Sequence, residues 1–330
     1  MDLSTWIIIL IATALFFDFL NGFNDSANIA ATIISSHSMR PRMALTIAAV
    51  AGFAGPFVFG VAVAKTIGHD IAIPQFITIQ VLVAALISGC VWSIITSAYG
   101  IPSSSSHALI GGLIGAVIIS SGIKAMLPKG LIIVGIALLL SPVAGLLFSW
   151  IIMKLIHILL KNATPKANYF FKYGQIPLAV ALASGNGAND AQKTIGIITL
   201  ALITAGYQQE FIVPFWVILI CASAKGLGSL IGGWRIIRTM GTRFYKIKPV
   251  HSFTSQLASS IVVIVSSLFG GPVSTTQVVS MSIVGAGAGE RISKVRWLAL
   301  KDIFLSWILT IPFTAIFAII VYWMLTFFFY

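Results

Sequence analysis

The chain has 330 residues, of which 58% are hydrophobic and only 8% are charged. A soluble domain carries about 25% charged residues, so this chain lacks the polar surface that a protein in water needs. The net charge of +12 does not indicate a nucleic-acid partner, because most basic residues lie in short loops between apolar segments. Many of these segments are about 20 residues long, which is enough to span a bilayer. These features predict an all-α polytopic membrane protein with the lipid bilayer as its environment.

The distribution of positive charge predicts the topology. Of the 20 Lys and Arg residues, 15 form four clusters, at 40–42, 154–172, 235–248 and 291–301. The positive-inside rule assigns such clusters to the cytoplasm. We therefore expect a multi-pass protein of the plasma (inner) membrane with both termini outside.

In chain order, the predicted elements divide into two repeats of opposite orientation. Residues 1–160 form the first repeat, residues 161–177 form an interfacial linker on the cytoplasmic side, and residues 178–330 form the second repeat. The first repeat starts outside and the second starts inside. Internal repeats of opposite orientation are a common plan of secondary transporters, which bind their substrate at the repeat interface.

A first motif occurs once in each repeat. Asn21–Asp25 reads NGFND and Asn186–Asp190 reads NGAND, so four of five positions are identical. Asn and Gly favour turns, so we expect a broken helix near 21–25 and another near 185–190. Freed carbonyls and side-chain oxygens suit a small cation, which would also offset the cost of an intramembrane carboxylate. The candidate cation-coupling residues are Asn24, Asp25, Asn189 and Asp190.

A second motif follows each first motif at a similar distance. Tyr99–His107 reads YGIPSSSSH and Phe269–Gln277 reads FGGPVSTTQ. Pro and Ser/Thr are typical of a helix N-terminus, whose free N–H groups form an anion site. We expect re-entrant helical hairpins near 99–121 and 268–289, with an oxyanion held at their tips by neutral donors and bound cations. The candidate donors are Ser104, Ser105, Ser106, Ser274, Thr275 and Thr276.

With these motifs, essentially the whole chain resembles the inorganic phosphate transporter (PiT) family. The resemblance implies two inverted repeats, each with a broken helix and a re-entrant hairpin. It also implies a symporter that imports inorganic phosphate with Na⁺ or H⁺, and for many members a homodimer. It places the cation sites at Asn24, Asp25, Asn189 and Asp190, which would be metal ligands only if the coupling ion is Na⁺, and phosphate at the hairpin tips.

The two copies of the first motif differ in the residues that follow. The first continues to Asn28, whereas the second continues with Gln192 and Lys193. The Gln-Lys form resembles a bacterial subgroup that includes proton-coupled transporters. Lys193 would either carry a coupling proton or pair with Asp190, three residues earlier on the same helical face. Further candidates for the pathway or for coupling are Asp18, Asn28, Gln192 and Lys193.

Other functions remain as alternatives at this point. A sulfate permease would use the same fold and the same anion site. An anion channel is disfavoured, because paired carboxylates would repel anions in an open pore. An enzyme is not expected, since the sequence contains no nucleophile–base pair, metal cluster or Gly-rich phosphate loop, and no cofactor is predicted beyond the coupling Na⁺ or H⁺.

Overall fold

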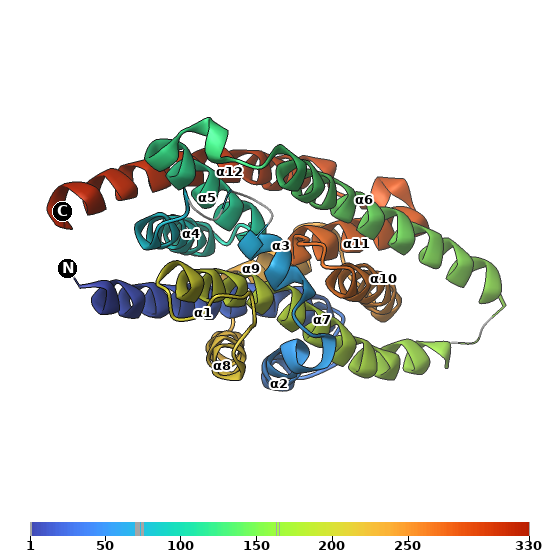
Figure 1. Ribbon diagram of the computed structural model, residues 1–330. Helices are drawn as coiled ribbons and strands as arrows, with labels where there is room; N and C mark the ends of the chain where they lie inside the picture. Colours follow the sequence, from blue (N-terminus) through green and yellow to red (C-terminus); the bar gives the residue numbers. More distant parts are fainter. Residues whose placement is uncertain (1, 70–72, 74–75, 163, 165, 330) are drawn as a thin grey trace.

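The computed structural model describes residues 2–69, 73, 76–162, 164 and 166–329. These residues form twelve α-helices and short 3-10 turns, without a β-strand in the described ranges (Figure 1). The first six helices are α1 (Leu3–Ser35), α2 (Pro41–Phe59), α3 (Ala62–His69), α4 (Ile79–Tyr99), α5 (Ser105–Ser121) and α6 (Pro128–Leu159). The other six are α7 (Ala167–Thr204), α8 (Phe215–Ile231), α9 (Trp234–Thr242), α10 (Pro249–Leu268), α11 (Thr275–Glu290) and α12 (Trp297–Phe329).

The two sets of six helices correspond in order and in length. Helices α1 to α6 have 33, 19, 8, 21, 17 and 32 residues. Helices α7 to α12 have 38, 17, 9, 20, 16 and 33. The packing is also matched: α1 lies on α8 as α7 lies on α2, and α5 lies on α12 as α11 lies on α6. Each half therefore packs mainly against helices of the other, and the two halves form one intertwined unit.

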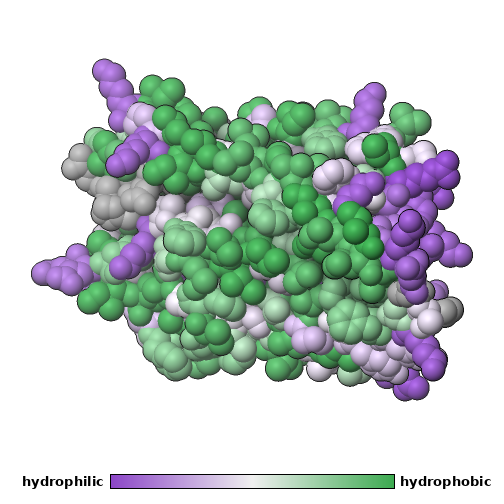
Figure 2. Space-filling model, turned by 90° about the vertical axis from the view of Figure 1, so that its right-hand side faces the viewer, coloured by the Kyte–Doolittle hydropathy of each residue, from purple (hydrophilic) through white to green (hydrophobic). Residues whose placement is uncertain are grey.

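The described residues confirm an all-α membrane protein. Six helices are long and apolar enough to cross a membrane, and the pair α8 and α9, bent by 66°, raises the number to as many as seven. Figure 2 shows a broad band of hydrophobic residues between two ends where hydrophilic residues gather. In Figure 1 both chain termini lie on one side, and the connection between α6 and α7 lies on the other. Which side faces the cytoplasm stays a prediction.

The expected helix breaks near 21–25 and 185–190 are wrong, because α1 and α7 run through these positions without interruption. The glycines serve close packing instead. A Cβ on Gly22 would overlap the backbone carbonyl of Lys225, and a Cβ on Gly187 would overlap that of Gly52. Small residues allow membrane helices to approach in this way.

The breaks lie one helix further along the chain. The segment α2–α3 is interrupted at Gly60 and the segment α8–α9 at Gly232, both with φ of 76°. Glycine adopts this left-handed backbone without steric cost. Each half therefore contains one discontinuous helix, placed beside the motif rather than inside it.

The predicted linker is shorter in the structure than 161–177. Helix α7 begins at Ala167 and continues through Pro177. A membrane helix tolerates an internal proline where its neighbours satisfy the freed backbone group. Residues 163 and 165 of the linker lie outside the described part of the chain.

The two hairpins are formed by α4 with α5 and by α10 with α11, and their connecting turns meet inside the molecule. Ser106 Oγ of the first hairpin donates to Val273 O of the second at 2.9 Å. Ser104 and Ser274 are the N-caps of α5 and α11, and each accepts a hydrogen bond from the backbone N–H three residues later. Side-chain capping by Ser at these helix starts agrees with the sequence pattern.

Candidate functional site

Four charged side chains are buried together in the middle of the helices. Asp25 comes from α1, Asp190 and Lys193 come from α7, and Lys225 comes from α8, and none of the four is more than 3% exposed. Buried charges of this kind inside a membrane protein mark functional sites by default, because each costs several kcal/mol unless it is paired. We refer to these four residues as the central charge cluster.

Lys225 connects the two carboxylates of the cluster. Its Nζ lies 3.1 Å from Asp25 Oδ2 and 3.0 Å from Asp190 Oδ2, and it also donates to Asn186 O at 2.9 Å. The three donor positions of the ammonium group are thus matched by three oxygens from α1 and α7. One lysine of α8 therefore holds together the two copies of the first motif.

Lys193 connects the cluster to the hairpins. Its Nζ forms an ion pair with Asp190 Oδ1, donates to Ser106 Oγ at 2.5 Å, and lies 3.2 Å from Val273 O. Both oxygens of Asp190 therefore contact a lysine. With two lysines and two aspartates, the central charge cluster has no net charge.

Three of the six predicted phosphate donors lie against this cluster. Thr275 Oγ1 donates to Asp190 Oδ2 at 3.0 Å, and Thr276 Oγ1 donates to Asp25 Oδ1 at 3.3 Å. Ser106 is the third, through Lys193. The hydroxyls of Thr275 and Thr276 and the two lysine ammonium groups, which would suit an oxyanion, are thus directed at carboxylate oxygens, whereas the Ser106 hydroxyl donates to Val273 O. Two ammonium groups, those of Lys193 and Lys225, lie among these donors.

The other three predicted phosphate donors lie at the starts of α5 and α11. Ser104 and Ser274 act as N-caps, and Ser104 Oγ also lies 2.7 Å from His107 Nδ1. Ser105 is partly exposed beside them. These three residues surround the tips without touching the carboxylates.

The candidate cation ligands Asn24 and Asn189 bond to the hairpins and not to the charged side chains. Asn24 Oδ1 accepts from Ser97 Oγ of α4 at 2.5 Å. Asn189 Nδ2 donates to Ser267 Oγ of α10 at 3.2 Å and to Gly271 O at 3.1 Å. Each therefore connects a long helix to the end of the first helix of a hairpin, in equivalent places of the two halves.

The remaining candidates divide between the cluster and its surroundings. Asn28 Nδ2 donates to Asp25 Oδ1 at 3.0 Å and so lies against the central charge cluster. Gln192 bonds instead to the break between α2 and α3, where its Oε1 accepts from Val63 N at 2.7 Å and its Nε2 donates to Gly60 O. Asp18 is fully buried, and its Oδ1 accepts from Thr194 Oγ1 at 2.7 Å.

The structure adds three residues that the sequence did not assign to the site. Lys225 is central to it, and the signal was a lysine within an apolar span. Asn21 and Asn186, the first residues of the two motifs, are buried with side-chain amides that find no hydrogen-bond partner among the described residues. Buried amides of this kind are normally satisfied by water or by a ligand, so these two side chains are further candidates for contact with a bound molecule.

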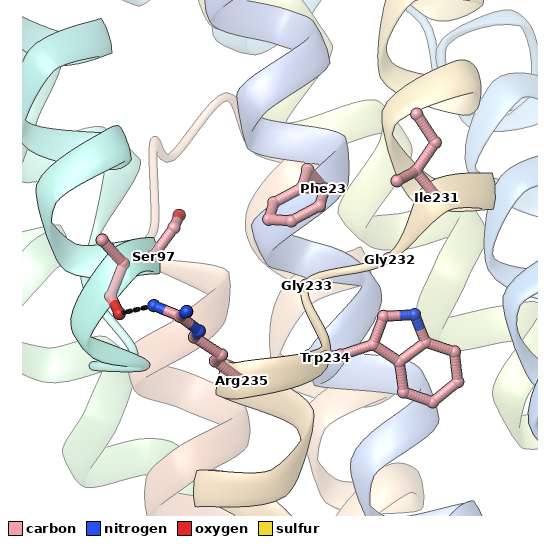
Figure 3. Close-up of a pocket in the computed structure, with 8 residues that line it drawn as sticks. Phe23, Ser97, Ile231, Gly232, Gly233, Trp234 and Arg235 are labelled. Atoms are coloured by element: carbon pink, nitrogen blue, oxygen red, sulfur yellow. Dashed lines mark hydrogen bonds between the residues drawn. The ribbon is translucent and has the colours of Figure 1, made fainter.

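A cavity of about 470 Å³ lies beside the first motif, at the break between α8 and α9. Phe23 of α1, Ser97 of α4 and the segment Ile231–Arg235 line it (Figure 3). Figure 3 shows Arg235 reaching toward the end of α4, where its Nη1 donates to Ala98 O, while the side chain of Trp234 points in the opposite direction. Ser97, which lines the cavity, is also the residue that donates to Asn24.

Together, the intertwined halves and the paired hairpins define a polytopic membrane protein of the inverted-repeat type, with a charge cluster buried at its centre. The phosphate transporter family matches the chain in two segments, residues 21–167 and 160–318. The chain belongs to this family, which confirms the resemblance seen in the motifs.

Individual relatives and a solved structure agree with this assignment. A probable low-affinity inorganic phosphate transporter of Rhizobium meliloti is 42% identical, over 95% of this chain and 94% of its own. A protein of Bacillus subtilis with the same description is 41% identical, over 96% of each. A solved structure described as the sodium-dependent phosphate transporter superposes with a TM-score of 0.90 over 98% of this chain and all of its own, at 24% sequence identity. At that identity the similarity shows the fold.

Proposed function

We propose that this protein imports inorganic phosphate across the plasma membrane as a proton-coupled symporter. The observation that carries the proposal is the central charge cluster, where lysine donors from α7 and α8 and hydroxyl donors from α11 converge on two carboxylates. Phosphate offers oxygens of the same kind, and charge-assisted hydrogen bonds are the strong ones for such an anion. Phosphate is expected to bind by taking over donors that the carboxylates now occupy.

The balance of charge supports coupling to a cation. The two aspartates and two lysines cancel, so a bound phosphate would add at least one uncompensated negative charge to a buried site. An uncompensated charge at this depth costs several kcal/mol. A cation that enters with the anion removes this cost, which is the physical basis of symport here.

The contacts of the carboxylates favour a proton over sodium. Lysine nitrogens contact both oxygens of Asp190 and one oxygen of Asp25, and amide and hydroxyl donors occupy the other. A sodium ion there would face two nearby ammonium charges. Asp18, by contrast, forms no ion pair in the described part of the chain; Thr194 Oγ1 donates to one of its oxygens, and the thiol of Cys221 lies close to its carboxyl group. A buried carboxyl group without a counter-charge is neutralised by a proton, so Asp18 is the residue we assign to the coupling proton.

The fold supplies a route for alternating access. The two halves of the molecule pack against each other through equivalent helix pairs, and the hairpin tips contact each other through Ser106 and Val273. Rocking of one half against the other would open the cluster first to one side of the membrane and then to the other. Loading of phosphate and proton together would shift the population between these two states.

Uptake of ³²P-labelled phosphate into proteoliposomes tests the proposal. Accumulation driven by an inward proton gradient in sodium-free buffer is expected, with unlabelled sulfate a weak competitor. Accumulation that requires a sodium gradient would remove the proton assignment. Sulfate that outcompetes phosphate would support a sulfate permease. An internal phosphate concentration that never exceeds the external one would indicate a channel.

A further inference from the structure

A second cavity, of about 370 Å³, lies next to the one shown in Figure 3 and contains three arginines. Arg235, Arg238 and Arg243 line it together with Tyr99, Gly100 and two threonines of α9. This cavity is separate from the central charge cluster, since none of the four cluster residues lines it.

The sequence of α9 explains why the arginines converge. Arg235 and Arg238 are three residues apart, so they lie on one face of the helix, and Arg243 follows directly after its last residue. The opposite face carries Ile236, Ile237 and Met240, which are buried. All three arginines are therefore on the exposed side, around one cavity, and a guanidinium stays charged at every physiological pH.

These arginines lack acidic partners. Among the described residues, no Asp or Glu forms an ion pair with Arg235, Arg238 or Arg243, and only Arg235 is engaged, through the carbonyl of Ala98. Two lysines of the predicted cytoplasmic side do have an acidic partner, since Lys248 and Lys294 both pair with Glu290. The cavity thus has several free guanidinium donors and a strong positive charge.

The arginine cavity leads toward the central site. Arg235 lines both cavities, and the larger one is bounded by Phe23 and Ser97. Ser97 donates to Asn24, which is adjacent to Asp25 of the central charge cluster. Neighbouring residues thus extend from the arginine cavity to the residue beside Asp25, and the arginines belong to the basic segment 235–248 of the predicted cytoplasmic side.

We propose that Arg235, Arg238 and Arg243 form a second phosphate-binding site, which receives the anion on its way between the central charge cluster and the cytoplasm. The assignment rests on the proposed function, since phosphate must be the transported anion. Planar guanidinium groups bind tetrahedral oxyanions through paired N–H donors. A positive cavity also concentrates an anion locally and speeds its entry.

A purely topological role does not account for the arrangement. The positive-inside rule requires basic residues on one side of the membrane but not three arginines around one cavity. The phosphate group of an anionic lipid shares the chemistry of free phosphate, so the experiment must separate these two sources.

The test compares the double variant Arg238→Gln/Arg243→Gln with the control Arg296→Gln. Arg296 is an exposed arginine of the same predicted side that lines neither cavity. Arg235 is left in place because it holds the end of α4. Exchange of ³²P-labelled for unlabelled phosphate is measured at equal pH on both sides, in right-side-out and everted membrane vesicles and in proteoliposomes of pure phosphatidylcholine or of phosphatidylcholine with phosphatidylglycerol.

In the double variant, the phosphate concentration for half-maximal exchange is expected to rise about tenfold, at the cytoplasmic face only and in both lipid mixtures. This concentration should also depend much less on salt than in the unaltered protein. The control should match the unaltered protein. An unchanged cytoplasmic value, or an equal rise at both faces, would overturn the proposal. A rise seen only with phosphatidylglycerol would assign the arginines to a lipid headgroup, which also overturns it. If the unaltered protein exchanges no phosphate, the proposed function fails and the phosphate assignment fails with it.

Discussion

The ammonium group of Lys225 lies 3.0 Å from Oδ2 of Asp190, and both side chains are buried. The same ammonium lies 3.1 Å from Asp25, so one lysine from α8 joins the aspartates of both halves. Relative motion of the halves, as proposed above, would strain or break this bridge in each cycle. We therefore expect stability and transport both to depend on it.

Replacement of this lysine by methionine, Lys225→Met, is expected to lower the free energy of unfolding by about 3–5 kcal/mol and to abolish uptake. The variant keeps the length of the side chain but leaves Asp25 buried without a cation. Thermal unfolding in detergent and ³²P-phosphate uptake measure the two effects. Lys301→Met, at an exposed lysine of α12, is the matched control and should change neither.

A double variant separates the charge from the packing. Asp25→Asn combined with Lys225→Met removes one charge of each sign, so it should recover part of the lost stability but no transport. Lys225→Met with normal stability and normal uptake would contradict the bridging role.

Neutral replacement of each aspartate, Asp25→Asn or Asp190→Asn, is expected to abolish concentrative phosphate uptake in a protein that stays monodisperse in detergent. Each change leaves two lysines facing one carboxylate. Asp190→Asn should lower the melting temperature more, because Asp190 contacts Lys193 and Lys225 whereas Asp25 contacts Lys225 alone. Uptake retained in both variants would remove the paired site.

The glycine of the first motif provides a test of the packing. A Cβ at Gly22 would overlap the backbone of Lys225, so Gly22→Ala should destabilise the protein by about 1–3 kcal/mol or more. Gly135→Ala in α6 is the control, since nothing lies within 4 Å of that position, and it should be neutral or stabilising by up to about 1 kcal/mol. Equal melting temperatures for the two variants would refute the close-packing role.

The sequence was sufficient for the membrane class, the repeat and the residues of the hairpin tips, since apolar length, charge clusters and repeated motifs all report on these directly. It misplaced the helix breaks because glycine and asparagine are read as helix-weakening, whereas close packing against a neighbouring carbonyl uses the same glycine. Which of the two applies at Gly22 depends on Lys225, about 200 residues further along the chain.

The pairing of the charges was equally out of reach of local reasoning. Lys193 lies three residues after Asp190, so their ion pair was one of two alternatives that the spacing offered. Lys225 stands out as a lysine within an apolar span, but its spacing cannot name its partners, because these are on other helices. The roles of Asn24 and Asn189 at the hairpin ends likewise depend on contacts with α4 and α10.

The remaining prediction concerns the coupling proton. If Asp18 carries it, the neutral variant Asp18→Asn resembles the protonated state at all times. Exchange of labelled for unlabelled phosphate at equal pH should then continue within about twofold of the unaltered protein, while accumulation driven by a proton gradient is lost. Both are measured in the same proteoliposomes, with Asp302→Asn at an exposed position of α12 as the control.

The two readouts together distinguish coupling from damage. A variant that had merely lost its fold, or the contact between Asp18 and Thr194, would lose exchange as well as accumulation. Accumulation that still follows the proton gradient in Asp18→Asn would show that the proton binds elsewhere. In that case Asp25 and Asp190 are the other buried carboxylates among the described residues. Coupling would then have to involve release of an aspartate from Lys225 or Lys193, because both oxygens of Asp190 already face a lysine.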